Sequence, residues 1–163
     1  MELLKWLTST NLGEMFFTML VSMVPVIELR GGVPFGTALG LPVGQALVAA
    51  IIGNMIPIPF IIVYIRRIFL WMRRKSKKLN ALVDKLEKKA HLKGQKVSKY
   101  KYVGLWLFVA IPLPGTGAWT GALVAAFLDL PLRKALPSIF LGVVTAGLIM
   151  TFATGLVVAT VGG

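Results

Sequence analysis

Residues 25–42 read P-V-I-E-L-R-G-G-V-P-F-G-T-A-L-G-L-P, and this segment decides the fold. It places two charged residues, Glu28 and Arg30, inside a long apolar run. Prolines and glycines this close together disfavour one continuous helix, so we expect helical order to break around Gly31 and Gly32. In hydrocarbon, unpaired backbone is tolerated only where protein or a water-filled cavity surrounds it. The segment therefore predicts an internal site, with the two costly charges as its first candidates for function.

The chain as a whole has the composition of an integral membrane protein. It has 163 residues, of which 56% are hydrophobic. Its apolar runs reach about 20 residues, the length that spans a bilayer. Residues 43–65 carry no charge and no polar face, which argues against a helix in the core of a soluble domain. The sequence predicts an all-α, multi-pass protein of the cell (inner) membrane.

The net charge of +12 is concentrated in one segment. Of the 18 lysines and arginines, 14 lie within residues 66–101. Basic residues beside membrane spans mark the cytoplasmic side. Apolar residues at helical spacing within residues 73–101 predict an amphipathic helix on the cytoplasmic membrane surface, where its lysines would meet anionic lipid headgroups. Nucleic-acid binding, the rival interpretation of such a cluster, is not expected because the rest of the chain lies in lipid.

The sequence offers little for catalysis or cofactor binding. It has no cysteine and a single histidine, His91, which excludes thiolate and multi-histidine metal sites. No set of nucleophile, base and metal ligands is recognisable. We therefore expect no cofactor, no metal and no enzyme activity.

The second half of the chain repeats the pattern of the first. An apolar arm from residue 102, a break through I-P-L-P-G-T-G-A-W-T-G and a second arm to residue 128 precede a long apolar span at residues 136–160. A shift of 89 residues keeps six identities in one register: Pro25 with Pro114, Gly32 with Gly121, Pro42 with Pro131, Ala46 with Ala135, Leu47 with Leu136 and Gly53 with Gly142. We interpret this as a duplication, with repeat 1 at about 12–70, the basic linker at about 71–101 and repeat 2 at about 102–160.

Each repeat would be a re-entrant helical hairpin followed by one transmembrane helix. The first arm, residues 12–24, can reach about 20 Å as a helix, which is short of the roughly 30 Å hydrocarbon core. With one crossing per repeat, the second copy must be inverted, so that the two breaks face each other near the midplane and both termini lie outside. In the alternative, both broken segments cross, giving four spans, parallel repeats and both termini inside. The short arms favour inversion.

Two local patterns predict details of the helices. Asn11 followed by Glu14 resembles a capping box that starts a helix at Leu12. Pro57 and Pro59 should kink the first long span.

The charged residues of the first break are the main candidates for transport. Glu28 is the candidate proton carrier. Burial raises the pKa of a carboxyl group and a nearby cation lowers it, so a modest rearrangement could change its protonation. Arg30 is the candidate anion binder, since a guanidinium can grip a phosphate bidentately. Gly31 and Gly32 would let backbone N–H groups approach the same anion. The alternative is that Glu28 and Arg30 pair only to fix the hairpin.

The second break supplies polar groups without charge. Thr116, Gly117, Trp119 and Thr120 could complete a polar pocket opposite the two charges. Turn chemistry is the alternative explanation for these residues.

Two further candidates lie outside the breaks. Asn54 would line the pocket or make an interhelical hydrogen bond. Asp129 precedes Leu130 and Pro131 and would cap the helix that begins there, with a transport role as the alternative.

The motifs P-V-I-E-L-R-G-G-V-P-F-G and I-P-L-P-G-T-G-A-W-T-G, with their spans, resemble the small family called putative small multidrug export proteins over nearly the whole chain. That family is similar to the DedA superfamily, whose members have two opposed re-entrant hairpins and are implicated in proton-coupled movement of polyprenyl phosphates and other lipids. The resemblance implies that Glu28 replaces the membrane-embedded acid of the first DedA hairpin. DedA proteins carry arginine in the second motif, where this chain has residues 116–119, so the phosphate-gripping role would fall on Arg30 and Arg133.

The expected function is therefore DedA-type transport of an amphiphilic anion such as a polyprenyl phosphate, with possible proton coupling through Glu28. Two alternatives stay open: export of small hydrophobic cations, which the family name suggests, and a non-transporting membrane scaffold. The expected partners are membrane lipids, and formation of a homo-oligomer stays open.

Overall fold

The computed structural model describes residues 10–98, 101–113 and 115–161. This part of the chain forms eight helices and no strand. The helices are α2 (Asn11–Met23), α3 (Glu28–Leu39), α4 (Val43–Met55), α5 (Pro57–Lys75), α6 (Lys77–Ser98), α7 (Lys101–Ala110), α8 (Ala118–Phe127) and α9 (Leu132–Val161). The predicted all-helical class is confirmed. Both chain ends, to which the predicted sidedness of the termini refers, lie outside the described residues.

Two helical segments are long and apolar enough to cross a bilayer. One is Val43–Lys75, which combines α4 and α5, and the other is Leu132–Leu156 of α9. They contain the predicted span at residues 43–65 and most of the one at residues 136–160. The first is interrupted at Ile56, directly before Pro57, where the proline nitrogen has no hydrogen to donate. The predicted kink at Pro57 and Pro59 stays a prediction, and the two segments have the length and composition of membrane spans.

The first break lies at residues 24–27, between α2 and α3. Val26 and Glu28 have positive φ angles of 82° and 49°, with which the chain reverses direction. Gly31 and Gly32 lie inside α3, so the prediction that order breaks around them is wrong by several residues. Tertiary packing explains the difference: Gly32 lies so close to Ser22 that a β-carbon would overlap the hydroxyl oxygen. A glycine in a helix is costly alone but allows neighbouring helices to approach.

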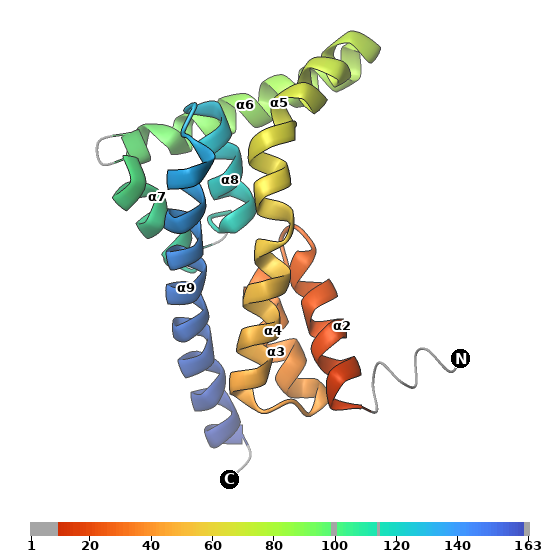
Figure 1. Cartoon of the computed structure of the whole chain (residues 1–163), viewed down its shortest axis with the longest axis vertical. Coiled ribbons are helices and arrows are strands. Elements are labelled where there is room, and N and C mark those ends of the chain that lie inside the picture. Colours follow the sequence, from red (N-terminus) through yellow and green to blue (C-terminus); the bar gives the residue numbers. More distant parts are fainter. Residues whose placement is uncertain (1–9, 99–100, 114, 162–163) are drawn as a thin grey trace.

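The second break, residues 111–117, lies between α7 and α8, as the sequence predicts. In Figure 1 the α2–α3 pair occupies the lower half of the molecule and the α7–α8 pair the upper half, with both connecting breaks near mid-height. The long helix α9 runs beside both pairs (Figure 1). The two breaks are therefore held at the same level of the bundle.

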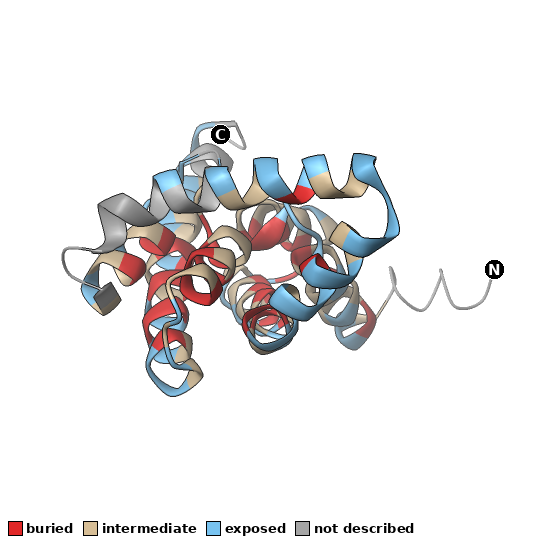
Figure 2. Ribbon diagram, turned by 90° about the horizontal axis from the view of Figure 1, so that it is seen from above, coloured by how far each residue is buried: buried red, intermediate tan, exposed pale blue. Residues whose placement is uncertain are grey.

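Helix α6 closes one end of the bundle. Seen from above, it lies across the ends of the other helices (Figure 2). The start of α2 and the C-terminal part of α9 lie at the opposite end (Figure 1). The basic segment thus forms a layer of its own, away from the ends of the described chain.

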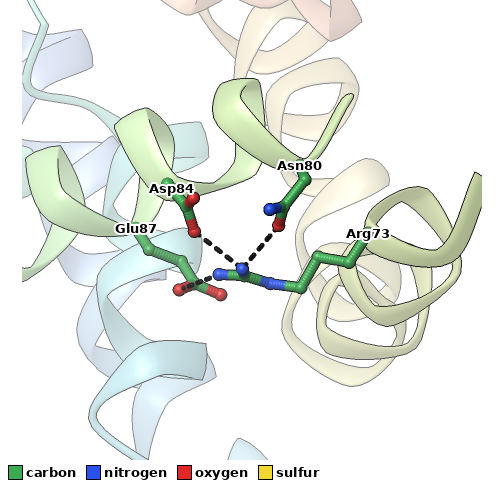
Figure 3. Close-up of polar contacts among 4 residues, drawn as sticks. All are labelled: Arg73, Asn80, Asp84 and Glu87. Atoms are coloured by element: carbon green, nitrogen blue, oxygen red, sulfur yellow. Dashed lines mark hydrogen bonds and ion pairs between the residues drawn. The ribbon is translucent and has the colours of Figure 1, made fainter. Parts of the chain in front are cut away.

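Arg73 of α5 contacts Asn80, Asp84 and Glu87 of α6, and we call these contacts the clamp (Figure 3). Ser76 is extended and separates α5 from α6. Across this bend, Arg73 Nη1 contacts Asp84 Oδ1 at 2.7 Å and Asn80 Oδ1 at 2.8 Å, while Nη2 contacts Glu87 Oε2 at 2.7 Å. Arg73 therefore joins the end of α5 to α6 through these contacts.

The N-terminus of α2 differs from the prediction by one residue. The capping residue is Thr10, whose hydroxyl oxygen accepts a hydrogen bond from the Gly13 N–H at 3.1 Å. Asn11 instead donates from Nδ2 to Gln45 Oε1 at 2.7 Å, linking α2 to the start of α4. The capping box predicted from Asn11 and Glu14 is therefore wrong: a threonine one position earlier provides the oxygen that the first turn needs.

Candidate functional site

Arg30 reaches from α3 to the second break. Its Nη1 donates to the carbonyl oxygens of Leu113 at 3.0 Å and Thr116 at 2.6 Å. Its Nη2 donates to the Ile111 carbonyl oxygen at 3.1 Å and to Thr116 Oγ1 at 2.9 Å. These carbonyls belong to the break that follows α7, not to the helix itself. The planar guanidinium thus ties the backbone of the second break together with four hydrogen bonds from one side chain.

Glu28 acts on the other side of the same break. Its side chain is buried, and Oε1 accepts a hydrogen bond from the Trp119 N–H at 3.1 Å. Gly117, the residue before α8, has a φ of 132° and no capping side chain. The carboxylate lies so close to Gly117 that a β-carbon there would overlap it. Glu28 therefore caps α8 from a different hairpin, and the N-terminal end of a helix favours a negative charge.

The two charges of the first break thus both bind the second break. Within the described residues no close ion pair joins Glu28 to Arg30. The alternative that the two residues serve only to fix the hairpin stays a prediction. Each binds backbone more than 80 positions away in the sequence, because the unpaired groups that need them lie there.

A cavity of about 600 Å³ lies where the breaks meet. The two charged side chains, Thr116, Trp119 and Thr120 contribute its polar groups. The other lining residues are Pro25, Val26, Pro112, Leu113, Gly115, Leu123 and Met150. Val26 is 94% exposed and Leu113 is 56% exposed, so the cavity opens at the surface between apolar tips. Most of its lining is apolar, and the polar groups of Glu28, Arg30 and Thr116 are exceptions within it.

The structure separates the predicted site residues into two groups. Glu28, Arg30, Thr116, Trp119 and Thr120 line the cavity, and Gly117 lies against the Glu28 carboxylate.

The paired glycines do not line it. The Gly31 N–H donates to the Ile27 carbonyl oxygen at 2.9 Å within the helix, and Gly32 packs against Ser22 and Ala50. The expectation that their N–H groups meet an anion is wrong for Gly31, because its hydrogen is already bonded.

Asn54 lies in α4 with a relative exposure of 0%. Neither Oδ1 nor Nδ2 has a hydrogen-bond partner among the described residues, so the predicted interhelical hydrogen bond is absent there. Trp119 Nε1 is likewise buried without a partner. Such groups are rare in native proteins and call for an explanation.

Asp129 and Arg133 have roles that differ from those predicted. Asp129 Oδ1 pairs with Arg66 Nη1 at 2.5 Å, and Arg66 Nη2 donates to the Phe127 carbonyl oxygen at 3.3 Å. These contacts join α5 to the end of α8, so Asp129 serves a tertiary contact instead of the predicted cap. Arg133 is exposed near the start of α9 and does not line the cavity. The expectation that it joins Arg30 is wrong.

Beyond the predicted site residues, the cavity is lined by Pro25, Val26, Pro112, Leu113 and Gly115 of the two breaks and by Leu123 and Met150. Leu123 follows Thr120 by three positions, so helical spacing on α8 could have placed both on one face. Val26 lies within the predicted break. Met150 has no signal in the sequence, since only the path of α9 brings it to the cavity.

Comparison with protein-family models matches residues 28–149 to the family described as Putative small multi-drug export protein. The chain belongs to this family. The matched segment begins at Glu28 and contains the whole of α3 to α8 and most of α9, including both charged residues and the second break. The resemblance to the small multi-drug export family is thereby confirmed, and its name places the chain among proteins of a transporter kind. No curated protein and no solved structure matches the chain.

Proposed function

We propose that this small multi-drug export protein is a DedA-type membrane transporter that moves an amphiphilic anion, a lipid phosphate such as a polyprenyl phosphate. The cavity between the breaks carries the proposal. Glu28 is 4% exposed and its carboxylate is bonded to backbone, whereas Arg30 is only partly buried. The charge that an occupant meets is therefore the guanidinium, which favours a phosphate over a cation.

The apolar rim supports a substrate with a hydrocarbon tail. Val26, Leu113 and Ile111, at the tips of the two breaks, are 94%, 56% and 47% exposed. The breaks lie at mid-height of a bundle with two segments of bilayer-spanning length (Figure 1). At that height the surroundings of a membrane protein are hydrocarbon. A headgroup can reach the polar groups of the cavity while its tail remains in lipid, which avoids moving the tail through a polar site.

The proposed topology is an inverted repeat of a re-entrant hairpin plus a transmembrane helix. The shift of 89 residues places Val43, the first residue of α4, on Leu132, the first residue of α9. It also places Glu28 on Gly117, which directly precedes α8. The basic α6 would lie at the cytoplasmic surface of the inner membrane, in contact with anionic headgroups, and both termini outside. Glu28 would carry a coupling proton.

Export of a small hydrophobic cation is the second candidate, favoured by the name of the family. It differs from the first in the charge of the substrate and in the residue that must recognise it. For a cation, Glu28 would have to leave the first turn of α8. For an anion, the partly buried Arg30 would have to exchange some of its four hydrogen bonds to the second break for bonds to the substrate.

A single reconstitution experiment tests both candidates. Purified protein is placed in vesicles containing either a fluorescent polyprenyl phosphate analogue or ethidium, and movement of each probe across the membrane is followed. We expect the wild type to move the lipid, Arg30→Ala to abolish movement, and Arg133→Gln, at an exposed position away from the cavity, to move it normally. Normal lipid movement by folded Arg30→Ala would remove Arg30 from the mechanism. Movement of ethidium alone would support the cation exporter. If neither probe moves, the result would support the non-transporting scaffold.

A further inference from the structure

The amide of Asn54 is the most unusual polar group outside the contacts described above. It is completely buried, and neither of its two polar atoms has a partner among the described residues. Ala50, one turn earlier on α4, and Ile58, four positions later at the start of α5, belong to the same buried core as Leu29, the residue after Glu28. The amide thus faces the protein core, where a desolvated polar group without a hydrogen bond is costly.

The packing register of α3 on α4 places this amide level with Glu28. A β-carbon at Gly36 would lie 2.9 Å from Ala46 Cβ, and one at Gly32 would lie 3.3 Å from Ala50 Cβ. These pairs are four residues apart on each helix, in opposite chain directions, as expected of antiparallel helices. The next step of the same register pairs Glu28 with position 54.

A primary amide and a protonated carboxyl group are complementary partners. The carboxyl O–H can donate to the amide oxygen while its C=O accepts from the amide N–H. An ionised carboxylate only accepts hydrogen bonds, which suits its present bond to the Trp119 N–H. On this register Glu28 has a complementary partner for each protonation state: the α8 N–H groups for the carboxylate and the Asn54 amide for the protonated carboxyl group.

We propose that Asn54 is the positioning residue that binds the protonated carboxyl group of Glu28. In the ionised state Glu28 caps α8; when it takes up a proton, its side chain turns to Asn54 and the first turn of α8 loses its cap. Protonation would thereby loosen the contact between the two hairpins beside the cavity. This inference rests on the proposed function for its purpose, namely coupling of a proton to substrate movement.

The other groups around Glu28 leave its carboxyl as the group that titrates. Arg30 lies two residues away on the same helix and is held by the second break. The facing turn of α8 offers backbone N–H groups, and α4 offers the amide. The acid on α2, Glu14, lies in its first turn, at the end away from the break. The charged residues of α9, Arg133 and Lys134, lie at its start.

Infrared difference spectroscopy of the full-length protein in lipid nanodiscs, titrated with acid, tests the proposal without any transported substrate. The carboxyl C=O band that disappears in Glu28→Gln belongs to Glu28. We expect this band at the low wavenumber of a hydrogen-bonded carboxyl group in the wild type. In Asn54→Leu it should move to higher wavenumber, and its titration midpoint should move to lower pH because the protonated form loses its partner.

Two further variants complete the test. Asn54→Ser keeps a hydroxyl group and should give an intermediate band, which keeps the test open if the leucine variant does not fold. Ser22→Ala, which removes a buried hydroxyl already bonded to the Thr18 carbonyl oxygen, should leave the band unchanged. The proposal is overturned if the band stays in place in both Asn54 variants, or if no band is lost in Glu28→Gln. Absence of lipid movement with a shifted band would instead reject only the proposed function.

Discussion

Replacement of Arg30 by methionine tests whether the guanidinium holds the second helix break. Methionine has no donor, so all four hydrogen bonds, from 2.6 to 3.1 Å, are lost. The two bonds to Thr116 are partly buried, whereas those to Ile111 and Leu113 are exposed to the surroundings. A hydrogen bond to a charged group contributes about 1.5–3 kcal/mol, and we count the exposed pair as negligible. We therefore expect the free energy of unfolding to fall by about 3 kcal/mol.

The assay is equilibrium unfolding in mixed micelles, followed by tryptophan fluorescence. Arg30→Lys retains the charge but has one nitrogen in place of a fork, so it should lose about half as much stability. Arg133→Met, at an exposed position at the start of α9, is the matched control and should be close to neutral. An unfolding free energy of Arg30→Met within about 0.5 kcal/mol of the wild type would refute the reasoning, because that is the range of substitutions that break no contact.

Three further predictions test the contacts of Glu28, Gly117 and Arg73. Glu28→Leu should lower the free energy of unfolding by about 1–2 kcal/mol in the same assay, because the cap and the charge at the start of α8 are lost. Glu28→Gln should lower it less, because the amide oxygen still accepts the hydrogen bond from the α8 backbone. Equal losses in the two variants would contradict the capping role. Gly117→Ala should destabilise by more than about 1 kcal/mol, since its φ is positive and a β-carbon would overlap the carboxylate. Gly44→Ala, with open space around it, should be neutral or slightly stabilising, and a loss at both positions would contradict the packing argument. Arg73→Gln should increase tryptic cleavage around Ser76, and high salt should do the same to the wild type; an unchanged cleavage rate would show that the clamp does not hold α6.

Local sequence patterns predicted the helices better than the positions at which they begin. The uncharged run at residues 43–65 and the interruption before Pro57 follow from hydropathy and from the missing proline hydrogen. The first break lies at residues 24–27 and not around Gly31 and Gly32, because the low helix propensity of glycine does not decide where this helix begins. In this bundle Gly32 is retained in a helix, since only a residue without a side chain fits against Ser22. Tertiary packing thus reversed the expectation from propensity.

In the candidate site, too, the sequence identified the residues but not their partners. The cost of a charge in an apolar segment identified Glu28 and Arg30 without any structure. Their partners could not be identified in this way, because side chains bind whichever unpaired backbone the fold brings near. Asp129 illustrates the point: its position before a proline predicts a cap, yet it pairs with Arg66, which also binds the end of α8.

The sequence by itself determined that this is a helical membrane protein with two long spans, two interruptions and one basic surface helix, because hydropathy, proline and charge act locally along the chain. Only the tertiary structure decided that the acid of one interruption caps the helix after the other and that its base binds the other interruption's carbonyls, and that the amide at position 54 is buried without a partner among the described residues. Hydrogen bonds between segments depend on the path of the whole backbone, and no local pattern contains that path.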